Sequence, residues 1–386
     1  MVRVTVVGVG FGGLKAVREI RRRVPEARIT VVAPRPEMLY YPSLVGIPVG
    51  ATDPSDVRID VRGFLARHDV DFEPAVLTGL DEGGRRVLTD HGEIANDALV
   101  IASGAESLHR PAGLEHTVAP CEGPDAAARI RERIAALDGG TIAFGFAGHP
   151  DEPTAARGGP VFEVLLSVDT QLRREGRRSQ FELTFFNAST EPGSRLGERA
   201  VRRVMDEMRR RGVSTHLGQP LRGFAPGQVL TADEEIPADL IVFIPGMVGP
   251  AWARDAGLPL SPGGFIRADR SCRVLGHPGV FVVGDAGAYT GAADWLPKQG
   301  HAAEFQAITA AHNVASYLAG QPANETFREE LVCIIDALDT GIMVYRSARV
   351  ARAWSSPAWR VVKHALEART RRAYGDGRRA GAGPVD

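Results

Sequence analysis

The sequence predicts an α/β fold with parallel sheets, and three observations support this prediction. Short apolar runs of strand length alternate with helical stretches along most of the 386 residues. Several of these runs are apolar throughout, as expected for strands that helices cover on both faces. The length suggests two or three domains, and there is no solenoid repeat or low-complexity tract to indicate another architecture.

Two series of strands and helices account for this class. In the first series we expect strands over 2–7, 29–33 and 99–102, a helix over 14–23, and a hairpin turn at 81–84. In the second we expect helices over 125–137, 159–174 and 198–211 and strands over 141–146 and 181–186. Further strands over 240–244 and 280–283 and a long helix over 298–318 follow.

A glycine-rich loop joins the first strand to the first helix. It reads Gly8-Val9-Gly10-Phe11-Gly12-Gly13. In a Gly-x-Gly-x-x-Gly loop the first glycine permits a tight turn, the second lets the backbone approach a pyrophosphate, and the third allows close helix–strand packing. The helix N-terminus then faces the phosphates. The loop therefore predicts that a dinucleotide binds here.

The acidic residue that usually closes the second strand and binds ribose is missing. The strand ends Val32-Ala33-Pro34-Arg35. Glu37 is the nearest acid and reaches the ribose only by a detour of the loop. Arg35 is the alternative contact, against the adenine or a phosphate.

Two later segments and a helix start complete a known pattern. They are Leu99-Val100-Ile101-Ala102-Ser103-Gly104-Ala105, Val280-Phe281-Val282-Val283-Gly284-Asp285-Ala286 and Trp295-Leu296-Pro297-Lys298-Gln299-Gly300-His301. With the glycine loop they resemble the pyridine-nucleotide-disulfide oxidoreductase superfamily, over about residues 2–340. The resemblance implies an FAD cofactor held by Gly8, Gly10, Phe11, Gly12, Gly13, Arg35, Ser103, Gly104, Gly284 and Asp285. It also implies that Lys298 stabilises the reduced flavin from the start of the long helix.

The resemblance implies two Rossmann-like domains of the glutathione-reductase type plus a C-terminal element. The FAD domain would consist of residues 1–110 and 236–320, the second domain of residues 111–235, and the C-terminal element of residues 321–386. The segment Gly145-Phe146-Ala147-Gly148-His149-Pro150-Asp151 lacks a second Gly-x-Gly-x-x-Gly loop, so we expect a degenerate nicotinamide site.

Other segments resemble sulfide:quinone oxidoreductases and flavocytochrome c sulfide dehydrogenases, relatives of type II NADH dehydrogenases. They are Gly158-Gly159-Pro160-Val161-Phe162-Glu163, Tyr40-Tyr41-Pro42-Ser43-Leu44 and the surroundings of Cys333 and Cys121. The resemblance implies thiol redox chemistry at Cys333 with Cys121, and proton transfer by Glu163. An ordinary buried cysteine is the alternative for Cys333, and Cys272 is interpreted as structural. Attachment of FAD to Cys121 stays open.

One departure from this branch bears on the donor. The branch has a further redox cysteine just before its Gly-Pro segment, where this chain has Arg157 or Gly158. Sulfide oxidation needs two sulfurs. Either Cys121 takes the second role, or the donor is not sulfide.

The C-terminal tail is basic, although the whole chain has a net charge of −1. Residues 346–379 contain ten Lys or Arg and two acids, and Trp359, Val362 and Leu366 lie near one face of an amphipathic helix. The tail predicts contact with an anionic membrane surface; docking on the protein's own body or on a second subunit is the alternative. We expect no nucleic acid and no metal, and a cytoplasmic protein, free or peripheral on the inner face of the membrane.

These features together predict an FAD-dependent oxidoreductase that passes electrons from a small donor through the flavin to a quinone. An NAD(P)H-dependent flavoprotein dehydrogenase is the first alternative. A catalytically lapsed flavin-binding protein that the tail recruits to a membrane is the second. A homodimer is neither indicated nor excluded.

Overall fold

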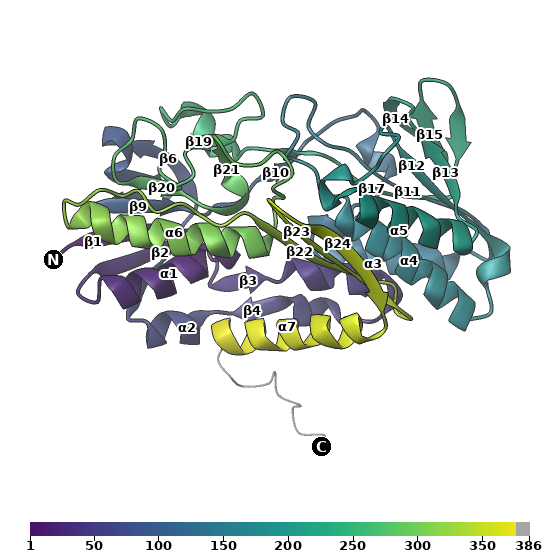
Figure 1. The fold of residues 1–386 in the computed structure, drawn as a ribbon, viewed down its shortest axis with the longest axis horizontal. Helices are drawn as coiled ribbons and strands as arrows, with labels where there is room; N and C mark the ends of the chain where they lie inside the picture. The colour runs from purple at the N-terminus through teal and green to yellow at the C-terminus, as the bar shows by residue number, and fades with distance from the viewer. Residues whose placement is uncertain (376–386) are drawn as a thin grey trace, which may run out of the picture.

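The computed structural model describes residues 1–375 and consists of two α/β halves joined by a C-terminal sheet and helix (Figure 1). The first half contains a five-stranded parallel sheet of order β20-β9-β1-β2-β5. Its strands are β1 (Arg3–Val7), β2 (Arg28–Ala33), β5 (Val70–Pro74), β9 (Ala98–Ile101) and β20 (Val280–Val282). Helices α1 (Phe11–Arg23) and α6 (Gly300–Leu318) pack side by side on this sheet. The predicted α/β class is confirmed.

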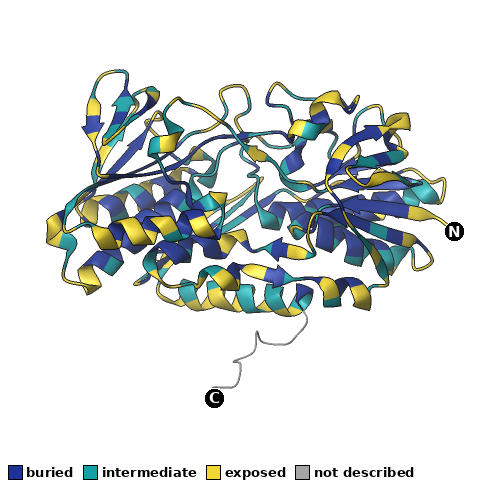
Figure 2. Cartoon of the chain, turned by 180° about the vertical axis from the view of Figure 1, so that it is seen from behind, coloured by how far each residue is buried: buried dark blue, intermediate teal, exposed yellow. Residues whose placement is uncertain are grey.

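The second half repeats this arrangement with a four-stranded parallel sheet of order β13-β12-β11-β17. Its strands are β11 (Gly140–Phe146), β12 (Phe181–Asn187), β13 (Ser214–Leu217) and β17 (Leu240–Ile244). The helices of this half are α3 (Pro124–Ala136), α4 (Gly159–Arg174) and α5 (Glu198–Arg210). The strands are buried and the outer helix faces are exposed (Figure 2).

Strand β17 lies in a different sheet from the one we expected. It pairs in parallel with β11, so the second half extends beyond the boundary placed at residue 235. The apolar run Leu240–Ile244 would be equally buried in either sheet, and its pattern therefore did not indicate which neighbour it would take.

Short sheets surround the two main sheets. One antiparallel three-stranded sheet consists of β6 (Leu77–Asp81), β7 (Arg86–Thr89) and β8 (Gly92–Ala95), and the expected turn at 81–84 joins its first two strands. Another consists of β14 (Leu221–Ala225), β15 (Gln228–Thr231) and β16 (Glu235–Pro237). Two antiparallel pairs are β3 (Glu37–Leu39) with β4 (Arg58–Asp60) and β10 (Glu106–Ser107) with β18 (Met247–Val248), and one parallel pair is β19 (Ile266–Ala268) with β21 (Gly287–Tyr289). The short helix α2 (Arg62–Arg67) precedes β5.

The C-terminal element bridges the two halves. Strands β22 (Glu330–Asp336), β23 (Gly341–Ser347) and β24 (Ala351–Ser356) form an antiparallel sheet, and α7 (Ala358–Tyr374) runs from this sheet back to the first half (Figure 1). Tyr374, at the end of α7, is 1% exposed; its ring packs edge-on against Phe64, and its hydroxyl donates to Glu304 at 3.1 Å. Helix α7 is therefore docked on the protein's own body.

Docking leaves much of the expected apolar face of α7 uncovered. Of its three expected residues, Trp359 is half-buried, whereas Val362 and Leu366 are exposed; Val361, outside that face, is exposed as well. The part of the basic tail beyond residue 375 lies outside the described residues. Within residues 1–375, no helix is long and apolar enough to cross a membrane.

Candidate functional site

The glycine loop has the geometry that a pyrophosphate requires. Gly8 has a φ of +104°, and a Cβ there would lie 2.3 Å from the carbonyl oxygen of Ala102. A Cβ on Gly13 would lie 2.0 Å from the oxygen of Gly8, so neither position admits a side chain. A Cβ on Gly10 would meet nothing within 4 Å. Gly10 is the N-cap of α1 and faces open space, where a phosphate would fit.

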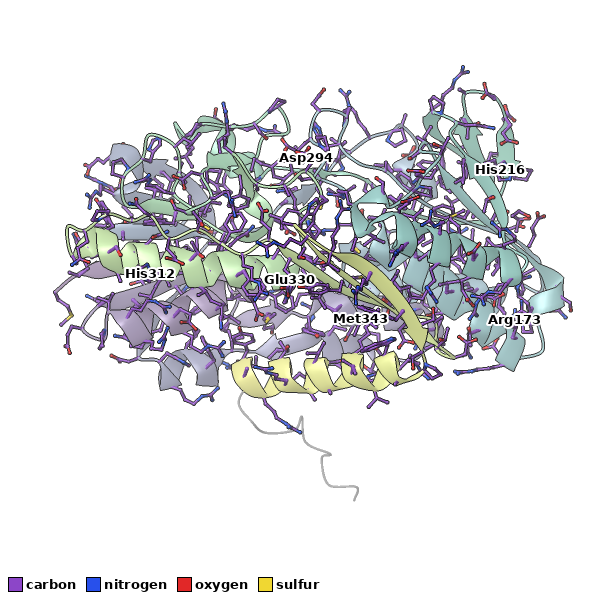
Figure 3. The ribbon with its side chains drawn as sticks, in the orientation of Figure 1. Arg173, His216, Asp294, His312, Glu330 and Met343 are labelled. Atoms are coloured by element: carbon purple, nitrogen blue, oxygen red, sulfur yellow. The ribbon has the colours of Figure 1, made fainter. Side chains whose placement is uncertain are left out.

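A large cavity of about 1580 Å³ extends from this loop between the two halves. Most of the expected site residues line it: Gly10, Phe11, Gly12, Gly104, Cys121, Glu163, Gly284, Asp285, Lys298 and Cys333. The volume exceeds that of pockets for drug-sized ligands, as a dinucleotide requires. Asp294, which lines the cavity, is labelled in Figure 3 in the central region between the halves.

Four of the expected FAD residues are not part of the cavity lining. Gly8 and Gly13 lie behind the loop and shape its turn. Ser103 accepts a hydrogen bond from Trp252 Nε1 at 3.3 Å. Arg35 and Glu37 are both exposed, but only Glu37, on β3, lines the cavity. The structure thus places the acid, rather than Arg35, in the cavity lining.

Three helices direct their N-termini at this cavity. Gly10 and Phe11 at the start of α1, Gly158 and Gly159 at the start of α4, and Gln299 and Gly300 at the start of α6 all line it. None of the three has a side-chain cap among the described residues. Their free N–H groups and positive dipole ends favour negative charge in the cavity. Both the pyrophosphate and a reduced flavin would benefit from this field.

Arg157 lies beside the aspartate expected to hold FAD. Its Nη2 is 2.5 Å from Oδ2 of Asp285, and its guanidinium stacks over the ring of Tyr41 at 5.7 Å. Burial opposes the charge of Arg157, but Asp285 outweighs this effect and the pKa of Arg157 is raised. A half-buried cation therefore lies at one of the two positions, Arg157 or Gly158, where the resemblance led us to expect a sulfur.

Lys298 lies two residues before α6 and is half-buried. Its Nζ donates to the carbonyl oxygens of Asp285 at 2.9 Å and Gly287 at 2.6 Å, and lies 3.9 Å from the ring centroid of Phe265. Burial lowers the pKa of Lys298 to about 8 despite the nearby charge of Asp285. The ammonium can therefore exchange its proton near physiological pH.

Cys121 and Cys333 line the same cavity from different elements. Cys121 lies in the turn before α3, and Cys333 lies on β22 opposite the start of α4, where a Cβ on Gly159 would be 3.7 Å from Sγ. Burial raises the pKa of Cys121 to about 11 and that of Cys333 to about 12. Both thiols are thus protonated at neutral pH in this structure. Cys272 is fully buried away from the cavity and donates to the oxygen of Gln306 at 3.4 Å, as suits a structural residue.

Glu163 connects the thiol region to α7. It lies on α4, is buried, and forms an ion pair with Lys363 of α7. Burial raises the pKa of Glu163 to about 7, although Lys363 pulls it the other way. A carboxyl group with this pKa can accept and release a proton at neutral pH.

The segment between β11 and α4 has no second Gly-x-Gly-x-x-Gly loop. Between β11 and α4, residues 147–158 cross toward the first half, where Ala155 is buried against Met247 and Phe265. The N–H of Met247 donates to the carbonyl of Ala155 at 3.1 Å. The segment lies where a short loop would otherwise cradle a pyrophosphate at the start of α4.

No local pattern in the sequence indicated that two further arginines would line the cavity. Arg195, between β12 and α5, and Arg346, on β23, both line it. They lie far apart in the chain and in no motif, so only the folded chain brings them together.

Comparisons with known proteins agree with this geometry. The family model described as pyridine nucleotide-disulphide oxidoreductase matches residues 2–312. The chain is 23% identical over 351 residues to the sulfide-quinone reductase of Aquifex aeolicus, covering 86% of this chain and 80% of that protein. It is 22% identical over 365 residues to the type II NADH:quinone oxidoreductase of Staphylococcus saprophyticus, covering 89% and 90%.

The fold comparison gives the same picture. The crystal structure of the sulfide:quinone oxidoreductase from Aquifex aeolicus superposes with a TM-score of 0.86 at 20% identity, covering 98% of this chain and 93% of that one. The expected oxidoreductase class and FAD cofactor are confirmed by the family match, which spans most of the chain. The chain therefore belongs to the pyridine nucleotide-disulphide oxidoreductase family.

Proposed function

We propose that this flavoprotein accepts electrons from a small donor and delivers them to a quinone. One observation carries the proposal: a single cavity connects the glycine loop, Lys298, both cavity thiols and α7. Bound FAD would supply the chemistry by taking up two electrons from the donor and returning them to the acceptor. Relatives named for quinone reduction support this choice of acceptor.

The protein's own residues would bind and orient the reactants and move protons. The α6 N-terminus and Lys298 would hold negative charge at the flavin, and Glu163 would carry a proton. With Arg157 in place of a sulfur, a two-thiol route would have to pair Cys333 with Cys121. A donor that needs no second sulfur fits the same cavity.

The segment 147–158 favours such a donor over a nicotinamide nucleotide. A pyrophosphate bound at the start of α4 would need the space and N–H groups of a short glycine loop. Here Ala155 instead closes the segment onto the first half. NAD(P)H oxidation is therefore the alternative activity, and bleaching of the flavin by NADH distinguishes it from the proposed one.

The quinone would enter from a membrane on which α7 rests. Val361 is 71% exposed, Leu366 is 44% exposed and Tyr41 is 47% exposed, and the last two border the cavity. An apolar rim beside a basic helix suits peripheral contact with an anionic bilayer.

Vesicles containing phosphatidylserine should sediment the protein, and Leu366→Ser should weaken this binding. Val76→Ser, an exposed residue of the first half, should not.

The decisive experiment is anaerobic bleaching of the flavin absorbance, followed by addition of a short-chain quinone. Rapid bleaching by sulfide that is lost in Cys333→Ser but kept in Cys272→Ser would establish the sulfur route. Bleaching by NADH alone would refute it and assign the chain to nicotinamide oxidation. A flavin that no donor bleaches, or that quinone does not reoxidise, would refute the proposed activity altogether.

A further inference from the structure

Arg195 and Arg346 are neighbours in the cavity wall, although they come from different elements. The Nη1 of Arg346 donates to the carbonyl oxygens of Arg195 at 2.7 Å and Ser194 at 3.3 Å. Its guanidinium also lies over the ring of Trp295 at 4.9 Å. Arg195 in turn donates to the carbonyl oxygens of Thr154 at 2.6 Å and Ala156 at 2.6 Å. All these contacts are to neutral groups.

Neither arginine forms an ion pair with a carboxylate among residues 1–375. Burial lowers the pKa of Arg195 to about 10 and also lowers that of Arg346, and no acid offsets either effect. Both arginines are half-buried, and charges that are withdrawn from water in proteins are normally paired. Each guanidinium has five N–H donors, and the described contacts use two of them.

The surroundings add to the positive potential. Arg157 and Arg195 both lower the pKa of Lys298, so these three cations act on one region of the cavity, where Asp285 and Glu152 are the acids that act on Lys298 in the opposite direction. Asp285 balances Arg157, but FAD would engage the same aspartate if the family contact forms. The α4 N-terminus opens on the same wall. An anionic ligand would supply the charge that the protein lacks here.

We propose that Arg195 and Arg346 form an anion-binding subsite that takes the oxyanion group of the electron donor, either a carboxylate or a sulfur oxyanion. Planar guanidinium groups match such oxygens with paired hydrogen bonds. Arg346 contacts Trp295, which lies three residues before Lys298 in the chain. This contact puts the subsite at the expected flavin end of the cavity. Identification of the anion as the donor rests on the proposed function, whereas anion binding itself does not.

The test is calorimetric titration of the FAD-loaded full-length protein at low ionic strength with thiosulfate, acetate or ADP. We expect thiosulfate or acetate to bind, and Arg346→Gln to weaken that binding about tenfold to hundredfold, the loss typical of a hydrogen bond to a charged group. Arg199→Gln, an exposed position on the neighbouring helix, should bind like the wild type. Binding of thiosulfate would indicate a sulfur oxyanion, and binding of acetate an organic acid.

Three results would overturn the proposal. These are no binding of thiosulfate or acetate, equal affinities in Arg346→Gln and Arg199→Gln, and binding of ADP alone, which would assign the wall to a nucleotide phosphate. Arg195→Gln and Arg195→Lys serve as a second pair, because lysine restores the charge and should recover part of the affinity. Melting temperatures of all variants would show whether the fold is retained. Anion binding without quinone reduction would refute the proposed activity and leave the subsite standing.

Discussion

The ionisation of Cys333 provides a quantitative test of the site. Burial and the neighbouring Glu163 raise the pKa of this thiol from 9.0 to about 12. At pH 8 the folded protein should therefore hold about a thousandfold less thiolate at Cys333 than the unfolded chain. The logarithm of a thiolate's rate constant rises by about 0.4–0.5 for each unit of its pKa. The more basic thiolate of the folded protein is therefore roughly 16- to 32-fold more nucleophilic. The net expectation is an exchange rate about 30- to 60-fold slower than in the unfolded chain.

The assay is thiol–disulfide exchange with neutral 2-hydroxyethyl disulfide, followed by mass spectrometry of the peptides. Glu163→Gln removes the neighbouring carboxylate and should accelerate the reaction of Cys333, while Lys363→Met should slow it. Cys121 is an internal control, because Glu163 does not contribute to its pKa of about 11. The reasoning fails if folded and unfolded Cys333 react at similar rates, or if its rate stops rising below pH 9.

Further predictions follow from single contacts. Gly10→Ala should keep the melting temperature of the apoprotein but lose flavin absorbance, whereas Gly13→Ala should lower both, because only Gly13 is packed against backbone. The pKa of Lys298 is depressed from 10.5 to about 8 by folding, so stability should rise by about 2 to 3 kcal/mol as pH increases from 8 to 10.5; urea titrations of Lys298→Met should lack this rise. Tyr374→Ala should cost about 3 kcal/mol and expose α7 to limited proteolysis. The exposed Trp354→Ala should leave the proteolysis pattern unchanged.

Local patterns in the sequence were sufficient to predict the fold class and the dinucleotide loop. The β1-loop-α1 unit is contiguous, and its glycines are required by contacts within that unit and with the next strand, such as Gly13 against Gly8. Similar short-range signals predicted α4, α5 and α6 to within two residues at each end. The family match over residues 2–312 agrees with the resemblance inferred from these motifs.

Only the tertiary structure decided how separate motifs meet. The sequence showed that a cysteine was missing, but not that Arg157 pairs with Asp285, because 128 residues separate them. The sequence did not decide whether the tail helix α7 contacts a membrane or the protein's own body. In the structure Tyr374 packs against Phe64, so α7 contacts the body, and part of its apolar surface stays exposed.

The physical reason is the range of the interactions involved. Turn geometry, helix periodicity and strand burial act between near neighbours, so the chain itself specifies them. The assignment of β17 to a sheet, the unpaired charges of Arg195 and Arg346, and the pKa values of Cys333 and Glu163 depend on burial and on charges brought together from distant segments. For this protein the sequence by itself determined the fold class and the glycine-rich loop of the dinucleotide type, and the tertiary structure decided which charges and thiols line the cavity beside that loop.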